Sequence, residues 1–423
     1  MKKFHKLFSV LTLALLVLAN VVVPTTHAAE KTQVVFWHAM NGPQQEQLTK
    51  MVEEFNQSQD EIEVIEQNQG DYSTLQQSIM ASAASGNLPT ITQLTASHTP
   101  DYAAQGLLTP LDEYLTDENN FGQEKLDDIL PGFAAGMKYE DQYYAVPFSK
   151  SVRLMFVNQD LLDEIGGEVP TTWEELKALD EKMKAAGKEE PVLGLENGIA
   201  AEIETMARQN GAAWISDDLT QVDLGSDQAV EPVNFVKELL DTKVARTAGE
   251  DTYMSGPFSQ GATLLYIGSS AGIPYVEEGA KESNIHFTTA EIPVYADGEP
   301  LTIFAGNDLG VFQSATEEEK NAAVKFMAYL TDHTVDWVTQ TGYLPVTQSA
   351  IDSQEWQDYV AKNPMFEAAS KELPYGIAQP GYQGASEVHQ DLVKALDEIF
   401  INNASAKEQM QQVEDKVKGF LGL

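Results

Sequence analysis

The stretch YYAVPFSKSVRLMFVN, residues 143–158, decides the fold that we expect. It begins with two tyrosines, continues through small hydroxyl side chains around Lys150, and ends in an apolar strand at Asn158. This pattern is typical of a chain that crosses between two lobes and leaves small polar residues at the cleft between them. We therefore expect Ser149, Lys150 and Ser151 to lie at such a cleft.

The residues on the N-terminal side of this stretch alternate short strands with amphipathic helices. Residues 34–37 have the pattern of a strand, and the helix that follows carries apolar side chains at i, i+3, i+4 and i+7. A second strand begins near Ile62, a second helix contains Tyr72, and residues 90–94 form a third strand. This order predicts an α/β fold with doubly wound, mostly parallel sheets.

The N-terminus has the pattern of a secretion signal. Three lysines precede an apolar run, and Thr26-His27-Ala28 offers a small-x-small cleavage pattern. We therefore expect a signal peptide over residues 1–28 and an exported chain that begins near Ala29. A membrane anchor is the less favoured alternative, because Asn20 interrupts the run and a span needs roughly 20 apolar residues.

Length and cysteine content restrict the number of domains, the kinds of site and the location that we expect for the rest of the chain. Removal of the signal leaves about 395 residues, which predicts two domains because single cores stop growing near ~250–300 residues. The chain contains no cysteine, which excludes disulfides, thiolate metal sites and cysteine nucleophiles. A lipid-modified N-terminal cysteine is excluded as well. We therefore expect the protein in a periplasm or at an extracellular cell surface, not as a cysteine-anchored lipoprotein.

The chain is strongly acidic. Its formal net charge is −39, and removal of the three signal lysines leaves 23 positive against 65 negative residues, or −42. This charge repels nucleic acid and anionic membranes, so we expect no nucleic-acid partner. An anionic solute would also have to bind against this global field.

Six groups of residues that are far apart in sequence resemble the motifs of one family. They are Phe36-Trp37-His38-Ala39-Met40, Gly70-Asp71-Tyr72, Pro147-Phe148-Ser149-Lys150-Ser151, Phe258-Ser259-Gln260-Gly261-Ala262 with Ile267-Gly268-Ser269-Ser270, Ala305-Gly306-Asn307, and Thr341-Gly342-Tyr343-Leu344-Pro345. In order and spacing they are similar to the solute-binding proteins of bacterial ABC importers (extracellular solute-binding protein family 1). Within that family they resemble the branch that binds sn-glycerol 3-phosphate.

The resemblance implies a periplasmic-binding-protein fold of type II, with two lobes and a hinge of several crossings. It implies capture of a small solute by closure of the cleft, and delivery to an ABC permease driven by a cytoplasmic ATPase. We expect a monomer that has no catalytic residue, no metal and no cofactor. The expected first lobe combines residues 29–148 with 302–343, the second combines 150–300 with 345–423, and the crossings lie near 147–150, 299–303 and 343–346.

The same resemblance implies which residues contact the solute. They are Tyr72, Ser151, Ser270, Gly306 and Tyr343, with Trp37 as a possible wall of the cleft. Tyrosines provide an apolar face and a phenolic hydroxyl, serines donate and accept hydrogen bonds, and glycine lets the backbone approach a ligand closely. Alternative interpretations stay open: Tyr72 and Trp37 as core residues, Ser270 as the cap of a turn, and His38 as a structural histidine.

Two departures from the branch leave the solute open. Ala96 stands near the point where the branch has an acidic residue, and residues 374–384, PYGIAQPGYQG, contain none of the arginine that the branch uses for phosphate. Lys150 is either a substitute for that arginine or a solvated lysine beside the hinge. The first solute hypothesis is glycerol 3-phosphate or a glycerophosphodiester, and the alternative is a neutral sugar or oligosaccharide.

Other classes of function find less support in the sequence. A secreted carbohydrate-active enzyme is the main rival, but carboxylate pairs arise by chance among 65 acidic residues. No HExxH or P-loop pattern occurs in the chain. A surface adhesin would need an exposed aromatic platform rather than an enclosed cleft. We therefore expect a carrier and not an enzyme.

Overall fold

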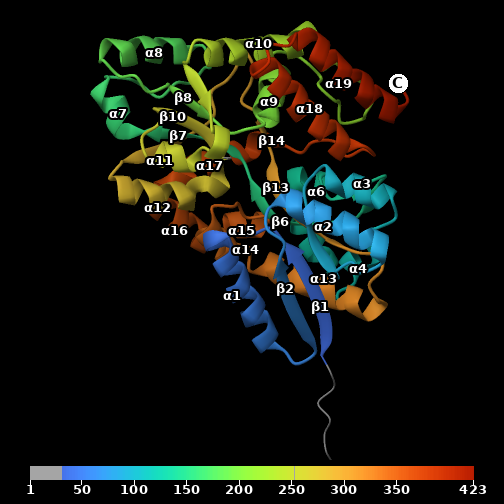
Figure 1. Cartoon of the computed structure of the whole chain (residues 1–423). Coiled ribbons are helices and arrows are strands. Elements are labelled where there is room, and N and C mark those ends of the chain that lie inside the picture. Colours follow the sequence, from blue (N-terminus) through green and yellow to red (C-terminus); the bar gives the residue numbers. More distant parts are fainter. Residues whose placement is uncertain (1–30, 252) are drawn as a thin grey trace, which may run out of the picture.

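The computed structural model describes residues 31–251 and 253–423, so the predicted signal peptide over 1–28 lies outside the described residues. Two five-stranded sheets, each covered by helices, form two lobes, which Figure 1 shows one above the other. Across the described residues, no helix has both the length and the apolar character needed to cross a membrane.

The first lobe is built on the sheet β2-β1-β3-β13-β6. Strands β1 (Thr32–His38), β2 (Ile62–Asn68) and β3 (Ile91–Leu94) run parallel, and helices α1 (Gly42–Ser58) and α2 (Tyr72–Ser85) connect them. These elements confirm the strand-helix order that the sequence predicts. Strand β13 (Ala305–Val311) then pairs antiparallel with β3 and with β6 (Val146–Ser151), so distant segments complete this sheet.

The second lobe is built on the sheet β11-β7-β10-β8-β9. Its strands are β7 (Arg153–Asn158), β8 (Leu193–Leu195), β9 (Ala245–Thr247), β10 (Leu265–Ser269) and β11 (Phe287–Ala290). Strand β8 runs parallel to β9 and β10, whereas β7 runs antiparallel to β10 and β11. The sheet is covered by helices that include α8 (Glu175–Ala185), α9 (Ala200–Gln209), α10 (Asp227–Asp241), α18 (Ala385–Phe400) and α19 (Ala406–Leu421).

The remaining α-helices and strands complete the two lobes and the connections between them. They are α3 (His98–Ala104), α4 (Asp112–Thr116), α5 (Gln123–Asp128), α6 (Pro131–Ala135), β4 (Lys138–Tyr139), β5 (Gln142–Tyr143), α7 (Gln159–Glu164), α11 (Ser255–Ser259), α12 (Ile273–Ser283), β12 (Thr302–Ile303), α13 (Glu317–Asp332), α14 (Thr334–Thr341), α15 (Gln348–Asp352), α16 (Gln354–Lys362), α17 (Glu367–Glu372) and β14 (Gly376–Ile377).

The stretch 143–158 forms the first crossing between the lobes. Every residue of β6 and β7 is buried, and the chain leaves one sheet for the other at Val152. The second crossing runs from β11 to β13 through β12, which pairs with β14. At the third, the backbone N–H of Leu344 donates to the carbonyl oxygen of Lys150 at 2.8 Å. Three backbone connections therefore meet beside the space between the lobes.

Candidate solute-binding site

A cavity of about 530 Å³ lies between the lobes, within the usual range for small-molecule sites. The first lobe contributes the loop after β1, the start of α2 and residues 95–97. The second lobe contributes Arg153, Glu196, α9 residues, and the segments around Tyr253 and Tyr275. All three crossings also reach its wall, so movement of one lobe against the other changes the shape of the cavity.

Four of the predicted contact residues line this cavity: Tyr72, Ser151, Gly306 and Tyr343. The side-chain amide of Asn307 donates to the Tyr72 hydroxyl at 2.8 Å, and the Tyr343 hydroxyl lies next to that of Tyr72. Burial raises the pKa of Tyr72 to about 12 and raises the pKa of Tyr343 well above its ordinary value. Both phenols therefore stay protonated at neutral pH and can serve as hydrogen-bonding groups.

The backbone conformation at Gly306 requires glycine. Its φ is +99°, and a Cβ at this position would lie 1.8 Å from the carbonyl oxygen of Ser149 on the neighbouring strand. The close approach of β13 to β6 therefore depends on the absence of a side chain. It also leaves the Gly306 backbone on the cavity wall.

The other two predicted residues, Ser270 and Trp37, are not among the lining residues. The backbone N–H of Ser270 donates to the carbonyl oxygen of Val152 at 2.9 Å, which places this serine directly behind the first crossing. Trp37 is half-buried, and its indole N–H donates to the side-chain oxygen of Gln67 at 2.8 Å. Ser269 lines the cavity beside Ser270.

Lys150 lines the cavity but is not solvated. Its side chain is 8 % exposed and its Nζ lies 2.6 Å from Asp308 Oδ1, on a carboxylate that is 1 % exposed. Burial raises the pKa of Asp308, and the charge of Lys150 acts in the opposite direction. The interpretation of Lys150 as a solvated lysine is therefore wrong, because the lysine is needed to neutralise a buried carboxylate.

Arg153 is the second cation on the wall, and sequence reasoning missed it. Its guanidinium donates from Nε to Glu202 at 2.7 Å and from Nη2 to Glu196 at 3.1 Å. Glu196 also accepts a hydrogen bond from the hydroxyl of Tyr266. One available signal was a charged residue at the start of an otherwise apolar strand, where burial requires a partner.

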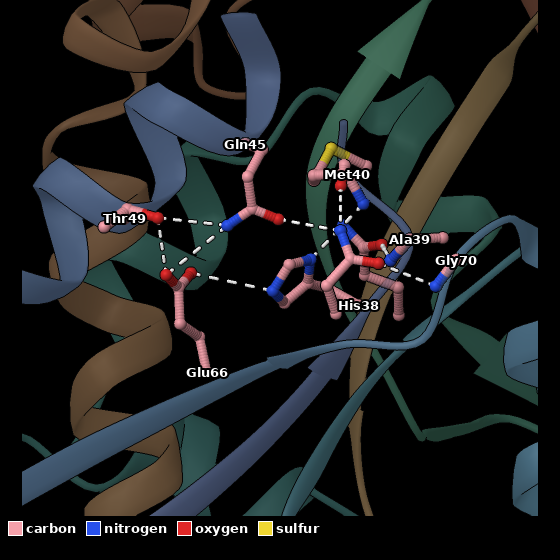
Figure 2. A network of polar contacts seen from close by, with 9 residues as sticks. His38, Ala39, Met40, Gln45, Thr49, Glu66 and Gly70 are labelled. Carbon is pink, nitrogen blue, oxygen red and sulfur yellow. Dashed lines mark hydrogen bonds and ion pairs between the residues drawn. The ribbon is translucent and has the colours of Figure 1, made fainter. Parts of the chain in front are cut away.

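A network of polar contacts behind the first-lobe wall includes His38, which is fully buried (Figure 2). The backbone N–H of Met40 donates to His38 Nδ1 at 3.3 Å, and His38 Nε2 lies 3.6 Å from Glu66. Burial lowers the pKa of His38 to about 4, so its imidazole is neutral at pH 7. The structure favours the interpretation of His38 as a structural histidine that orients the lining loop.

The same network connects two loops of the cavity wall. Asn68 donates from its side chain to the Met40 carbonyl and to Gln45, and it accepts from the backbone N–H of Gly70 at 2.6 Å. The loop after β1 and the loop that begins α2 are therefore held in one arrangement. Asp71 and Tyr72 extend from the second of these loops to the cavity.

Comparison with known proteins identifies the family. The family model described as "Bacterial extracellular solute-binding protein" matches residues 50–364. This chain belongs to that family. A curated relative of this solute-binding protein is the sn-glycerol-3-phosphate-binding periplasmic protein UgpB of Salmonella typhimurium, 25% identical over 369 residues, which cover 82% of each chain. The predicted resemblance is confirmed.

Solved structures confirm the predicted two-lobed α/β fold of type II. UgpB from Mycobacterium tuberculosis in complex with glycerophosphocholine has a TM-score of 0.80 and 21% identity, and the match covers 93% of this chain and 99% of that one. The GacH receptor of Streptomyces glaucescens, solved with acarbose, has a TM-score of 0.81 and 21% identity over the same shares. At such identities the likeness establishes the fold.

The solute-binding protein is therefore an extracellular component of an ABC importer. Such proteins bind small solutes and work with permease and ATPase subunits, and the relatives named here are binding proteins rather than enzymes. The nature of the solute depends on this chain's own cavity.

Proposed function

We propose that this protein captures a polyhydroxylated solute without net negative charge, with a neutral sugar or oligosaccharide as the first candidate. The observation that carries this proposal is the pairing of both cations on the cavity wall. Lys150 pairs with Asp308, and Arg153 pairs with Glu196 and Glu202. A phosphate monoester would need a cation that these carboxylates already occupy. Neutral hydroxyl groups need only the donors and acceptors that tyrosine, serine and backbone provide.

We assign solute contact to Tyr72, Ser151, Gly306 and Tyr343. Contacts from both lobes would stabilise the closed form over the open form, since a ligand shifts this equilibrium by its difference in affinity for the two. The moving units in this proposal are residues 29–148 with 302–343 and residues 150–300 with 345–423. Ser270 and Trp37 stay predictions as contacts, and a monomer is the proposed state for docking on the permease.

A glycerophosphodiester is the second candidate. Two similarities support it. This chain is 25% identical in sequence to a glycerol-3-phosphate-binding protein, and its fold is similar to that of a protein solved with glycerophosphocholine. A phosphodiester carries one negative charge rather than the two of a fully ionised monoester. Attachment to a cationic group then gives a solute without net charge. Glycerol 3-phosphate itself fits less well with the paired cations.

Calorimetric titration of the ligand-stripped mature protein with maltose and with glycerol 3-phosphate tests the proposal. We expect saturable heat with the sugar and weak or absent heat with the phosphate monoester. Recovery of the sugar unchanged would distinguish a carrier from a hydrolase. Tight binding of glycerol 3-phosphate, with loss of that binding in Lys150→Met, would contradict the proposal and show that the lysine serves phosphate.

A further inference from the structure

The charged groups around the cavity are out of balance. Five carboxylates and three cations belong to the wall and its direct ion pairs: Asp71, Glu196, Glu202, Glu204 and Asp308 against Lys150, Arg153 and Arg208. Burial lowers the pKa of His389, the histidine on this wall, so it adds no positive charge at neutral pH. By formal count the wall and its ion pairs therefore carry two negative charges in excess, although neutral hydroxyl groups require none. Burial raises the pKa of Glu204 and of Asp308, which opposes ionisation of these two carboxyls.

Asp71 holds one of these excess charges. It is exposed to the cavity at the N-cap of α2, where its Oδ1 accepts from the backbone N–H of Thr74 at 2.7 Å. Hydrogen bonds from Thr74 lower its pKa, so it is ionised at neutral pH. Within the described part of the chain, no basic side chain forms an ion pair with it. One carboxylate oxygen of Asp71 is therefore left for a solute.

Glu196 holds the other excess charge, on the opposite lobe. It follows β8 and shares the single guanidinium of Arg153 with Glu202, so two carboxylates compete for one cation. Both Glu196 and Asp71 act on the phenol of Tyr253, whose pKa burial and these two carboxylates raise. The two carboxylates therefore belong to opposite lobes and line the same cavity as this tyrosine.

Four tyrosines line the same cavity as these two carboxylates. Tyr72 and Tyr343 come from α2 and the third crossing, and Tyr253 and Tyr275 come from the second lobe. Tyr253 is 58 % exposed, and Tyr275 donates its hydroxyl to the backbone oxygen of Asn41 at 3.0 Å. Aromatic rings attract a cation through their electron-rich faces, most strongly where water is excluded.

We infer that the cavity contains a subsite for an ammonium group, formed by Tyr72, Tyr253, Tyr275 and Tyr343 with the carboxylates of Asp71 and Glu196. This inference rests on the proposed function and names the solute class: a polyhydroxylated molecule that carries a protonated amine or a quaternary ammonium. Two sources share this chemistry, namely an amino sugar and a glycerophosphodiester with a cationic head group. The net charge of the mature chain favours encounter with the amino sugar, which is the source that carries a net positive charge.

Matched pairs of solutes test the subsite by calorimetric titration. One pair is the glucosamine disaccharide and its N-acetylated form, and the other is glycerophosphocholine and glycerophosphoglycerol. We expect the cationic member of one pair to bind at least about tenfold more tightly, since cation–π and ion-pair contacts each contribute on this scale. The pair that shows the preference identifies the source. The preference should shrink as salt rises from ~0.05 to ~0.5 M.

The variant Asp71→Asn tests the assignment to residues, because asparagine caps a helix as well as aspartate does. We expect it to reduce the preference for the cationic member severalfold, and Tyr253→Leu to do the same. Asp117→Asn is the matched control: its carboxylate accepts from the backbone N–H of Asn119, outside the cavity wall, and its removal should leave the preference unchanged.

The outcomes separate the subsite from the proposed function. Binding of neutral members with no preference for a cation in either pair would overturn the subsite and leave the sugar carrier standing. A preference that Asp71→Asn does not change would overturn the assignment of the subsite to these residues. If none of these solutes binds, maltose included, both the proposed function and the subsite are overturned.

Discussion

At the scale of single residues, Gly306 is the position on the cavity wall where a side chain is tolerated least. Replacement by alanine forces a Cβ to within 1.8 Å of the Ser149 carbonyl oxygen and places a side chain at a φ of +99°. We expect Gly306→Ala to reduce the free energy of unfolding by at least about 2 kcal/mol, because strain and displacement of β6 add together. Urea denaturation of the variant measures this loss.

Gly187→Ala provides the matched control. Gly187 also has a positive φ, +73°, but a Cβ there would meet no atom within 4 Å. Only the left-handed conformation opposes this substitution, at a cost of about 1–2 kcal/mol. Equal losses in the two variants would contradict the view that the approach of β13 to β6 excludes a side chain.

Glu372 makes stability depend on pH. Its carboxyl is 1 % exposed and accepts from the backbone N–H of Ile292 in the second crossing. Burial raises its pKa to about 8, from an ordinary 4.5. The folded protein therefore keeps this proton while the unfolded chain releases it, and stability falls as the pH rises from about 4.5 to about 8. Below and above this window the group contributes no further change.

Glu372→Gln should remove that pH dependence, since glutamine keeps an acceptor oxygen and cannot ionise. We expect similar stability of variant and wild type near pH 5, and a variant that is more stable at pH 8 by up to about 4 kcal/mol. Chemical denaturation at both pH values measures the difference. The control Glu367→Gln, on the same helix but exposed and paired with Lys371, should gain no stability at pH 8. A parallel pH profile for Glu372→Gln and wild type would contradict the assignment.

Single residues also show where sequence reasoning ends. Tyr72, Ser151, Gly306 and Tyr343 reach the cavity wall, as the motifs predict, because each lies next to a turn or crossing that local sequence marks. The charge state of the wall depends instead on partners distant in sequence. Asp308 on β13 neutralises Lys150 on the neighbouring strand β6, and no local sequence pattern predicts that contact.

At the scale of elements, helix starts follow local signals unless a tertiary contact intervenes. Thr316 and Glu319 have the Thr-x-x-Glu spacing of a capping box, and they form one at the start of α13. The same pattern at Thr172 to Glu175 does not, because Thr172 forms a bridge with Val294 and the backbone N–H of Trp173 donates to the Val294 carbonyl oxygen. Helix α8 then begins at Glu175, whose carboxylate accepts from the backbone N–H of Thr172 at 3.2 Å. Strand and helix order was therefore predictable, and this boundary was not.

Helices α3 and α18 hold the lobes together on one side of the cavity. Asp101 of α3 accepts from the backbone N–H groups of Gly384 and Ser386 at the start of α18, at 2.5 and 2.9 Å. Charge-assisted hydrogen bonds of this kind contribute about 1.5–3 kcal/mol each. We expect Asp101→Ala to open the ligand-free protein, which small-angle scattering detects as a larger radius of gyration. Solute affinity should fall about tenfold, because fewer molecules occupy the closed form.

Asp127→Ala is the control for this contact. Asp127 lies on α5 of the same lobe, and its carboxylate accepts only from Gln123 of its own helix among the described side chains. Its removal should change neither the radius of gyration nor the affinity. An unchanged radius in Asp101→Ala would mean that the crossings alone hold the lobes closed.

At the scale of the whole molecule, the two-lobed architecture was predictable and the solute was not. Length and the alternation of strands with helices predict two α/β lobes without reference to any contact. The cavity forms between lobes from segments at both ends of the chain, so its chemistry depends on packing that composition does not encode. Tyr253 and Tyr275, for example, carry no local mark of a site, yet both line it.

The acidic surface gives the final prediction, which concerns the stability of the whole chain. With 65 acidic against 23 basic residues after removal of the signal, like charges repel each other most strongly in the compact state. Salt shortens the range of this repulsion from about 14 Å at ~0.05 M to about 3 Å at ~1 M. We therefore expect the melting temperature to rise by several degrees over this range, by equal amounts in sodium and potassium chloride. Surface ion pairs weaken in the same salt, but each contributes only ~0–1 kcal/mol. A melting temperature that does not change with salt concentration would show that charge repulsion contributes little to stability. A difference between the two salts would point to binding of a specific ion.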